Sequence, residues 1–257
     1  MFAEERQEKL LSILREKRKV AVSEMCEVFN VSGATIRADL RQLEEAGMLT
    51  RTHGGAVLRT RASFEQASDM REVVNLTAKE RIGQRAAALV EDGDIIVLDT
   101  GTTTLHIARH IRDRQNVTVV TNDYQIAREL EASPTIQIIL LGGIVKKGYH
   151  CVVSINGRSI LDTLNVDKAF MGANSLSVKH GACVADIMLA ETKRGMVEHA
   201  SQVIVVCDSS KLNNTSLAQF APAERIDTLV IDRLPDDAQA YQTAGIQIIT
   251  LDEDALP

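Results

Sequence analysis

The chain has 257 residues, of which 45% are hydrophobic and 25% charged, the ordinary composition of a globular protein. No apolar run approaches the roughly 20 residues that a membrane-spanning helix needs. The N-terminus is charged and lacks the apolar segment of a signal peptide. These features argue against a membrane protein and predict a cytoplasmic one.

The net charge of −6 is unevenly distributed along the chain. Residues 1–61 contain 11 Lys and Arg against 9 Asp and Glu, a net charge of +2. The remaining residues contain 18 and 26, a net charge of −8. This division predicts a small nucleic-acid-binding module joined to an acidic domain.

The cysteines and histidines are scattered and form no metal-ligand spacing. We expect four reduced thiols in a bacterial cytoplasmic protein that is associated with the nucleoid when bound to DNA. Nothing in the sequence indicates a metal or another cofactor.

Residues 1–58 predict a winged helix-turn-helix domain. Helical periodicity indicates helices over residues 4–17, after Ser23 and after Ser32, where each serine is expected to cap the helix that follows it. A tight turn separates the second and third helices, as in helix-turn-helix modules, in which the later helix enters the major groove. Around His53, a glycine-containing turn between two short strands predicts the wing.

The third helix carries its polar residues on the face opposite its apolar stripe. Thr35 and Arg37 are placed to reach base edges, and Arg41 lies one turn further on, nearer phosphate. The alternative is a structural three-helix module with solvated arginines. The candidate DNA-binding residues are Ser32, Thr35, Arg37, Arg41, Arg51 and His53.

A larger domain is expected over residues 77–257, after a linker over 59–76 that has weak periodicity and could include a short helical turn. The motif from Thr77 to Glu80 predicts a capping box that starts the first helix of this domain. Strands and helices alternate along the rest, which predicts a doubly wound, mostly parallel α/β sheet. Strands are expected near 95–98, 117–121, 136–141, 167–171, 203–207, 227–231 and 246–250, and helices near 104–112, 124–131, 157–164, 187–199 and 236–243.

The strand at 95–98 and the helix after it are joined by a short polar turn that begins at Asp99. Such a strand–turn–helix directs backbone N–H groups and the positive end of a helix dipole at one point. Gly101 would let an anion approach the backbone, and a side chain there would crowd the loop and impose an unfavourable backbone angle. The turn is interpreted as a phosphate site, and an ordinary capped turn is the alternative.

Other predicted strands also end in polar residues, and in a parallel sheet these ends lie at one edge. The residues at these ends, taken together, favour a shared polar pocket. The candidate effector-binding residues from these ends are Asp99, Gly101, Thr102, Thr103, Thr104, Thr121, Asn122, Gly142, Gly143, Asp208 and Lys211.

On these motifs the sequence resembles the DeoR family of bacterial transcriptional regulators. In the N-terminal part the resemblance rests on the run from Val31 to Leu40 and on His53-Gly54-Gly55-Ala56, and further along the chain on Asp167–Gly172 and Asp208–Lys211. The resemblance implies a sensor domain similar to ribose-5-phosphate isomerase that binds a phosphorylated sugar. It also implies that Lys193 points into the pocket, with Asp186 nearby.

The resulting hypothesis is a repressor of a carbohydrate-utilisation operon that a phosphorylated sugar releases from double-stranded operator DNA. A helix-turn-helix module usually reads two half-sites, so we expect a homo-oligomer, a dimer or a tetramer, and no membrane partner. The alternative is a sugar-phosphate isomerase or deaminase fused to a DNA-binding module, in which Asp99, Asp186 or Asp208 with Lys193 would supply the base and the cation. The fused basic module favours the non-enzymatic reading.

Overall fold

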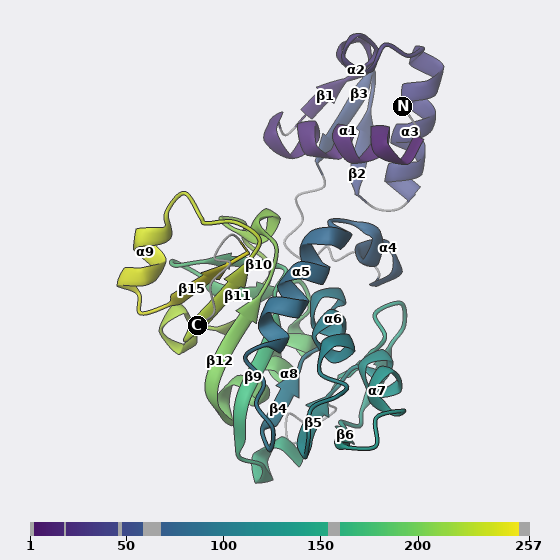
Figure 1. Ribbon diagram of the computed structural model, residues 1–257. Coiled ribbons are helices and arrows are strands. Elements are labelled where there is room, and N and C mark those ends of the chain that lie inside the picture. Colours follow the sequence, from purple (N-terminus) through teal and green to yellow (C-terminus); the bar gives the residue numbers. More distant parts are fainter. Residues whose placement is uncertain (1–2, 18, 46–47, 59–67, 154–159, 252–257) are drawn as a thin grey trace. The chain divides into compact units, whose positions relative to one another are not determined.

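The computed structural model describes residues 3–17, 19–45, 48–58, 68–153 and 160–251 (Figure 1). The chain divides into two compact units, Met1–Gln66 and Ala67–Pro257. No helix in these ranges is long and apolar enough to cross a membrane.

The first unit is a winged helix-turn-helix, as the sequence predicts. Its three-stranded antiparallel sheet has the order β1-β3-β2, and β2 and β3 form the wing around a turn at Gly54. The elements are α1 (Ala3–Lys17), β1 (Lys19–Ala21), α2 (Val22–Phe29), α3 (Gly33–Glu45), β2 (Leu49–Thr52) and β3 (Gly55–Leu58).

The two serine caps predicted in this unit have different outcomes. Ser32 caps α3 as expected, because its Oγ accepts the Thr35 N–H at 3.2 Å. The cap predicted at Ser23 is wrong, since α2 already begins at Val22 and its N-cap residue Ala21 makes no side-chain cap bond. The Val22 N–H instead donates to the Gly54 carbonyl of the wing at 2.8 Å, so a tertiary contact replaces the local one.

A buried ion pair joins α1 to α3. Arg6 donates through Nε and a terminal nitrogen to the two carboxylate oxygens of Asp39, at 2.6 and 3.1 Å. Ile36, Leu40 and Leu43 are buried beside this pair, as the helical spacing predicts. The bidentate contact fixes the rotation of α3 about its axis, and therefore which residues of α3 face outward.

The second unit is built on a seven-stranded sheet of order β15-β14-β12-β9-β4-β5-β6 in which every paired strand is parallel. This confirms the predicted doubly wound α/β class. The strands are β4 (Ile95–Leu98), β5 (Val117–Thr121), β6 (Ile136–Leu140), β9 (Val166–Gly172), β12 (Ala200–Val206), β14 (Thr228–Ile231) and β15 (Gln247–Thr250).

The helices cover both faces of this sheet, and each face has its own apolar core. One core includes Ile82, Ile107 and Ile126 of α5, α6 and α7, which lie together in Figure 1. The other includes Met196 of α8 and Tyr241 of α9. The helices are α4 (Ser68–Val73), α5 (Leu76–Ala87), α6 (Thr102–His110), α7 (Tyr124–Leu130), α8 (Ile187–Glu198) and α9 (Ala238–Thr243).

Several local expectations differ from the structure. The capping box at Thr77 is wrong, because α5 begins at Leu76 after Asn75, which adopts a left-handed conformation and makes no side-chain cap bond. Of the helix expected over 157–164, residues 157–159 lie outside the described residues, and the rest includes the short 3-10 helix η1 (Ile160–Thr163). The smaller strands were not predicted: β7 (Ile144–Lys146), β8 (Cys151–Val153), β10 (Ser175–Ser177), β11 (Gly181–Val184) and β13 (Ala218–Ala221).

Gly83 sets the close packing of α5 against α6. A Cβ added at this position would lie 2.4 Å from Cβ of His106 and 2.9 Å from its carbonyl carbon, so the helices would have to separate. We expect Gly83→Ala to lower the free energy of unfolding by about 1–3 kcal/mol, measured by urea denaturation.

Gly195 in α8 provides the matched control. A Cβ there would lie 3.6 Å from Cδ1 of Leu161, an ordinary contact. Gly195→Ala is therefore expected to be neutral or to stabilise the protein by up to about 1 kcal/mol, the helix preference of alanine over glycine. Equal losses in the two variants would contradict the packing argument.

Candidate functional site

The strand order places a topological switch point between β4 and β9. From β4 the chain builds the sheet outward through β5 and β6, then returns to the other side of β4 and adds β9, β12, β14 and β15. In open α/β sheets, ligands bind at the carboxyl ends of the strands beside such a point. Asp99 follows β4 at this position, and Gly172 ends β9.

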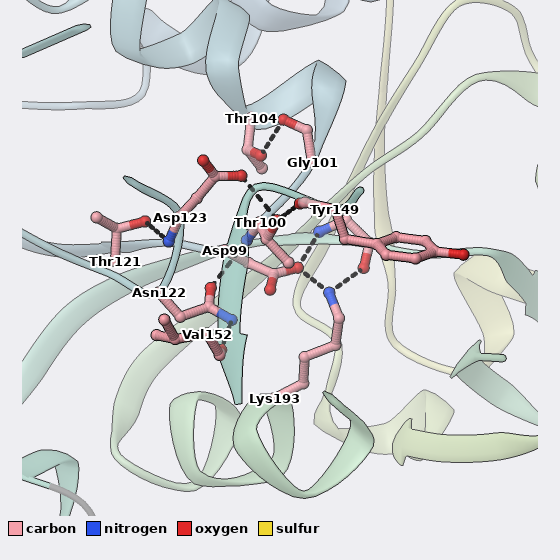
Figure 2. A network of polar contacts seen from close by, with 11 residues as sticks. Asp99, Thr100, Gly101, Thr104, Thr121, Asn122, Asp123, Tyr149, Val152 and Lys193 are labelled. Carbon is pink, nitrogen blue, oxygen red and sulfur yellow. Dashed lines mark hydrogen bonds and ion pairs between the residues drawn. The ribbon is translucent and has the colours of Figure 1, made fainter. Parts of the chain in front are cut away.

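Asp99 and Lys193 form a buried ion pair at the switch point (Figure 2). Their side chains are 0% and 2% exposed, and Lys193 reaches Asp99 from α8. Asp99 Oδ2 also accepts the Gly172 N–H, and Lys193 Nζ donates to the Gly172 carbonyl, each at 3.0 Å. The pair therefore links β4, β9 and α8.

The second carboxylate oxygen of Asp99 is unused. Oδ1 is buried and has no hydrogen-bond partner among the residues that the structure describes. Burial raises the pKa of Asp99, and the Lys193 charge opposes that rise. An unsatisfied buried acceptor at a switch point is suited to a hydroxyl donor from a ligand.

The turn after Asp99 leads directly into α6, as predicted. Gly101 is its N-cap, the Leu105 N–H donates to the Gly101 carbonyl at 3.0 Å, and Thr104 Oγ1 donates to the same carbonyl at 2.9 Å. Thr102 is half-buried and Thr103 is buried. The first N–H groups of a helix have no carbonyl partner within it, so those at the start of α6 are suited to an anion.

The backbone at Gly101 corrects one expectation. Its φ of 163° and ψ of 156° are extended, so a side chain there would not meet an unfavourable backbone angle. The expected crowding is confirmed, because a Cβ would lie 3.2 Å from Thr104 Oγ1, closer than an ordinary contact, and the Thr104 side chain would have to shift. Glycine at this position leaves open the approach to the start of α6 and is not required by the turn itself.

The residues after β5 hold the loop in place through internal hydrogen bonds. Asn122 Oδ1 accepts the Thr100 N–H at 3.1 Å, and Asn122 Nδ2 donates to the Val152 carbonyl at 3.1 Å. Thr121 Oγ1 accepts the Asp123 N–H at 3.0 Å (Figure 2). Asn122 and Thr121 are fully buried, and these bonds occupy the groups predicted to face the effector.

Thr100 and Asp123 belong to the polar strand ends that the sequence indicates, but they were not among the residues predicted to bind the effector. Thr100 Oγ1 donates to Asp123 Oδ2 at 2.7 Å, and Asp123 Oδ1 caps α7 by accepting the N–H groups of Gln125 and Ile126. The signal that could have identified Asp123 is its position just before the α7 periodicity, which is typical of an N-cap.

The remaining predicted residues lie at separate places along this edge. Gly142 and Gly143 are exposed after β6, the outermost strand. Asp186 is the N-cap of α8, where Oδ1 accepts the Leu189 N–H at 2.8 Å and Oδ2 pairs with Lys146 Nζ at 3.3 Å. The sequence had no indication of the pairing with Lys146, which depends on the β7–β8 hairpin.

Asp208 and Lys211 belong to a second charged cluster, and this cluster includes Lys79, which sequence reasoning missed. Asp208 Oδ1 accepts the Ser210 N–H at 3.0 Å, and Lys79 is 5% exposed and donates to the Arg71 carbonyl. Burial and the nearby Lys211 charge lower the pKa of Lys79 to about 8. Lys79 lies three residues before the buried Ile82, so the sequence places a charge on the apolar face of this helix. This pattern could have identified Lys79 as a candidate site residue.

Contacts through α4 connect this cluster to the switch point. Arg71 of α4 lies 5.8 Å from the Tyr149 ring centroid, and the Tyr149 carbonyl accepts from Thr100 Oγ1 at 3.4 Å. These contacts join the Lys79 cluster, through α4 and Tyr149, to the turn that follows Asp99.

In the first unit, the predicted DNA-binding residues lie on α3 and the wing. Arg37, Arg41 and His53 are exposed, and Ser32 Oγ lies 2.9 Å from Thr35 Oγ1. A groove of about 360 Å³ separates α3 from the wing and is lined by Val22, Arg37, Leu40, Glu44, Arg51, Thr52, His53, Gly54 and Gly55.

Two arginines of this face have contacts that the sequence did not reveal. The Arg37 guanidinium folds back toward the N-terminus of α3, where its nitrogen would lie 3.3 Å from a Cβ at Gly33. Arg51 is paired with Glu44 of α3, which accepts both the Arg51 N–H at 2.8 Å and Nε at 2.6 Å. Glu44 therefore attaches the wing to α3 and offsets part of the Arg51 charge.

The two units together define a class of protein, a DNA-binding regulator with its own α/β sensor unit. The comparisons support this class. Residues 6–62 match the model of the DeoR-like helix-turn-helix domain, and residues 74–233 match that of the DeoR C terminal sensor domain. The chain therefore belongs to the DeoR family of transcriptional regulators.

Similar proteins cover nearly the whole chain. The HTH-type transcriptional regulator GolR of Listeria innocua is 34% identical over 96% of this chain and 98% of its own length. The HTH-type transcriptional repressor GlcR of Bacillus subtilis is 34% identical over 99% of this chain and 98% of its own length. Among solved structures, ribose 5-phosphate isomerase A of Methanocaldococcus jannaschii matches 54% of this chain and 55% of its own, at 21% identity and a TM-score of 0.40.

Proposed function

We propose that this DNA-binding regulator is a repressor that a phosphorylated sugar releases from its operator by binding at the carboxyl edge of the seven-stranded sheet. The observation that carries the proposal is the arrangement around the switch point. There a buried carboxylate that has an unused oxygen and is paired with a buried lysine lies in the turn that leads into the start of a helix.

The phosphate group is assigned to the start of α6 and to the cations of the Lys79 cluster. Backbone N–H groups of Thr102 and Thr103 would donate to its oxygens, and Lys79 and Lys211 would balance its charge. The unit carries a net negative charge, so attraction by the whole domain cannot supply this affinity. Local donors have to supply it.

The sugar hydroxyls are assigned to the Asp99–Lys193 pair. Because Lys193 is already paired with Asp99, its charge is largely balanced before any ligand binds. Asp99 Oδ1 then serves as the acceptor for a hydroxyl group. This arrangement separates a phosphate-binding end from a hydroxyl-binding end.

A thermal-shift screen of phosphorylated sugars tests the proposal. A ligand at about 100 times its dissociation constant adds roughly 2.7 kcal/mol of stability, which is readily detected as a rise in melting temperature. A compound that stabilises the protein is then tested for release of a fluorescent operator fragment. Stabilisation by no phosphorylated sugar, or stabilisation without operator release, would contradict the proposal.

The pH dependence of binding tests the role of Lys79. Phosphate monoesters stay dianionic above pH 7, whereas Lys79 loses its proton near pH 8. We expect effector affinity to fall above pH 8, by up to about tenfold per pH unit, because each unit changes the protonated fraction about tenfold. The charged groups around it are Lys211, Asp208, Arg71 and Glu72.

The free energy of unfolding should rise between pH 8 and 10.5, the range over which effector affinity falls. The Lys79 pKa is about 8 in the folded protein and 10.5 without burial, so the unfolded chain binds more protons between these values. The penalty for burying the charge is therefore relieved as pH rises through this window.

The variant Lys79→Arg keeps its charge at high pH, so effector affinity should no longer fall above pH 8. A wild-type pH profile in that variant would contradict the assignment.

A further inference from the structure

We use the name α4–α5 elbow for residues 68–79, which contact the candidate effector site through Lys79 and Asn75. It follows residues 59–67, which connect it along the chain to β3 of the wing. The elbow contains α4, Asn75 and the first turn of α5. It is therefore the first part of the sensor unit that the chain reaches from the DNA-binding unit.

Polar contacts hold α4 in place, among them the Glu72 ion pair with Arg109 of α6 at 3.5 Å and the Arg71 guanidinium over the Tyr149 ring. The helix has six residues, too few to be stable alone. The Ser68 N–H donates to the Gly148 carbonyl at 2.8 Å, and Lys79 Nζ donates to the Arg71 carbonyl in the last turn of α4. Val73, at the end of α4, is 64% exposed and adds little apolar packing.

Asn75 forms the bend of the elbow. It adopts a left-handed conformation, with φ of 54°, which is rare for residues with a side chain. Its Nδ2 donates to Asp208 Oδ1 at 3.1 Å. The bend is thus attached to one residue of the candidate site through its side chain, and α4 is attached to another, Lys79, through the Arg71 carbonyl.

Both attachments depend on the charge that a phosphate would change. A dianion beside Lys79 and Lys211 competes with the Arg71 carbonyl for the Lys79 ammonium group, and it repels the Asp208 carboxylate that holds Asn75. The bound and free states therefore differ in interaction energy at two of the contacts that hold the elbow. Such a difference is what a ligand needs in order to shift a conformational equilibrium.

We propose that the α4–α5 elbow transmits effector occupancy, and that phosphate binding releases α4 by weakening the Lys79–Arg71 and Asn75–Asp208 contacts. This inference rests on the proposed function. Release of α4 alters the end of the segment that leads to the wing, which couples the sensor site to the operator.

Hydrogen exchange with inorganic phosphate as the probe tests this inference. In wild-type protein, phosphate is expected to increase amide exchange in residues 68–75 by about fivefold or more relative to chloride at the same ionic strength, the lower end of ordinary coupling between sites. Phosphate should also weaken binding of the operator fragment under the same conditions. Calorimetry measures phosphate binding separately.

The variant Asn75→Gly isolates the bend, because glycine keeps the left-handed conformation and removes the bond to Asp208. Exchange in residues 68–75 should then be fast with or without phosphate, and phosphate should no longer weaken operator binding. Asn116→Gly is the matched control, since Asn116 is also left-handed, with φ of 57°, and should behave as wild type.

The outcomes separate the two proposals. Absence of phosphate binding by calorimetry would contradict the phosphate site itself. Two results would overturn the elbow inference and leave the site in place. One is phosphate binding with unchanged exchange in residues 68–75, and the other is a phosphate effect on operator binding that is as large in Asn75→Gly as in the wild type.

Discussion

Replacing Lys193 by methionine is expected to destabilise the α/β unit by about 3–5 kcal/mol, the cost of leaving a buried charge without its partner. Asp99 is fully buried, and Lys193 is the cation that contacts it. Methionine has nearly the length of the lysine side chain, so the lost stability is due mainly to removal of the charge. Urea denaturation of the wild type and the variant gives the difference.

The pH dependence of this variant identifies the cause. Burial already raises the Asp99 pKa, and loss of Lys193 removes the main opposing charge. When folding raises the pKa of a carboxyl group, the free energy of unfolding falls as pH rises from the unfolded pKa, about 3.9, to the folded pKa. The deficit of Lys193→Met should therefore shrink at acid pH.

The double variant Asp99→Leu with Lys193→Met is the control. Removing both charges should restore most of the lost stability, because well-packed apolar residues often replace a buried pair at little cost. Effector binding should remain absent in the double variant, since the hydroxyl acceptor is gone. A single variant as stable as wild type at neutral pH would show that the pair is not buried as described.

Arg37→Ala is expected to weaken operator binding by about 1–3 kcal/mol and to relax the preference for one base pair. This loss corresponds to roughly 5- to 150-fold in affinity. The Arg37 guanidinium lies near Gly33 at the N-terminal end of α3, the part of a recognition helix that contacts base edges. Fluorescence anisotropy with the operator and with single-base variants measures both effects.

Arg41→Ala provides the comparison on the same helix. Arg41 is exposed one turn further along α3, where phosphate contacts are expected. Loss of this side chain should weaken binding to all DNA sequences about equally. It should also reduce the slope of log affinity against log salt concentration by about the contribution of one phosphate contact. A base preference unchanged in Arg37→Ala would contradict the orientation assigned to α3.

The periodicity of the sequence predicted the architecture because each strand and helix has a local pattern. The apolar runs at 95–98 and 203–207 correspond to β4 and β12, and the spacing of Ile36, Leu40 and Leu43 gave the buried face of α3. The caps were less predictable. The Gly54 carbonyl accepts the N–H of Val22, the first residue of α2, so the helix begins before Ser23, and this contact exists only after folding.

The candidate site was predicted as a region, and its internal contacts were not. Strand order brings Asp99 and Gly172 together, but the bonds of Lys193 to both depend on the packing of α8. Thr121 and Asn122 are in the expected place, with their polar groups used within the protein. Such pairings join residues far apart in the chain, so no local pattern specifies them.

The central claim is that the sensor unit recognises a phosphorylated sugar, and calorimetry with one sugar in its phosphorylated and unphosphorylated forms tests it most directly. Two hydrogen bonds to the phosphate at about 1.5 kcal/mol each amount to roughly 3 kcal/mol. The phosphorylated form should therefore bind about 100-fold more tightly or better. Equal affinities for the two forms would contradict the account, because the start of α6 and Lys79 would then have no anion to bind.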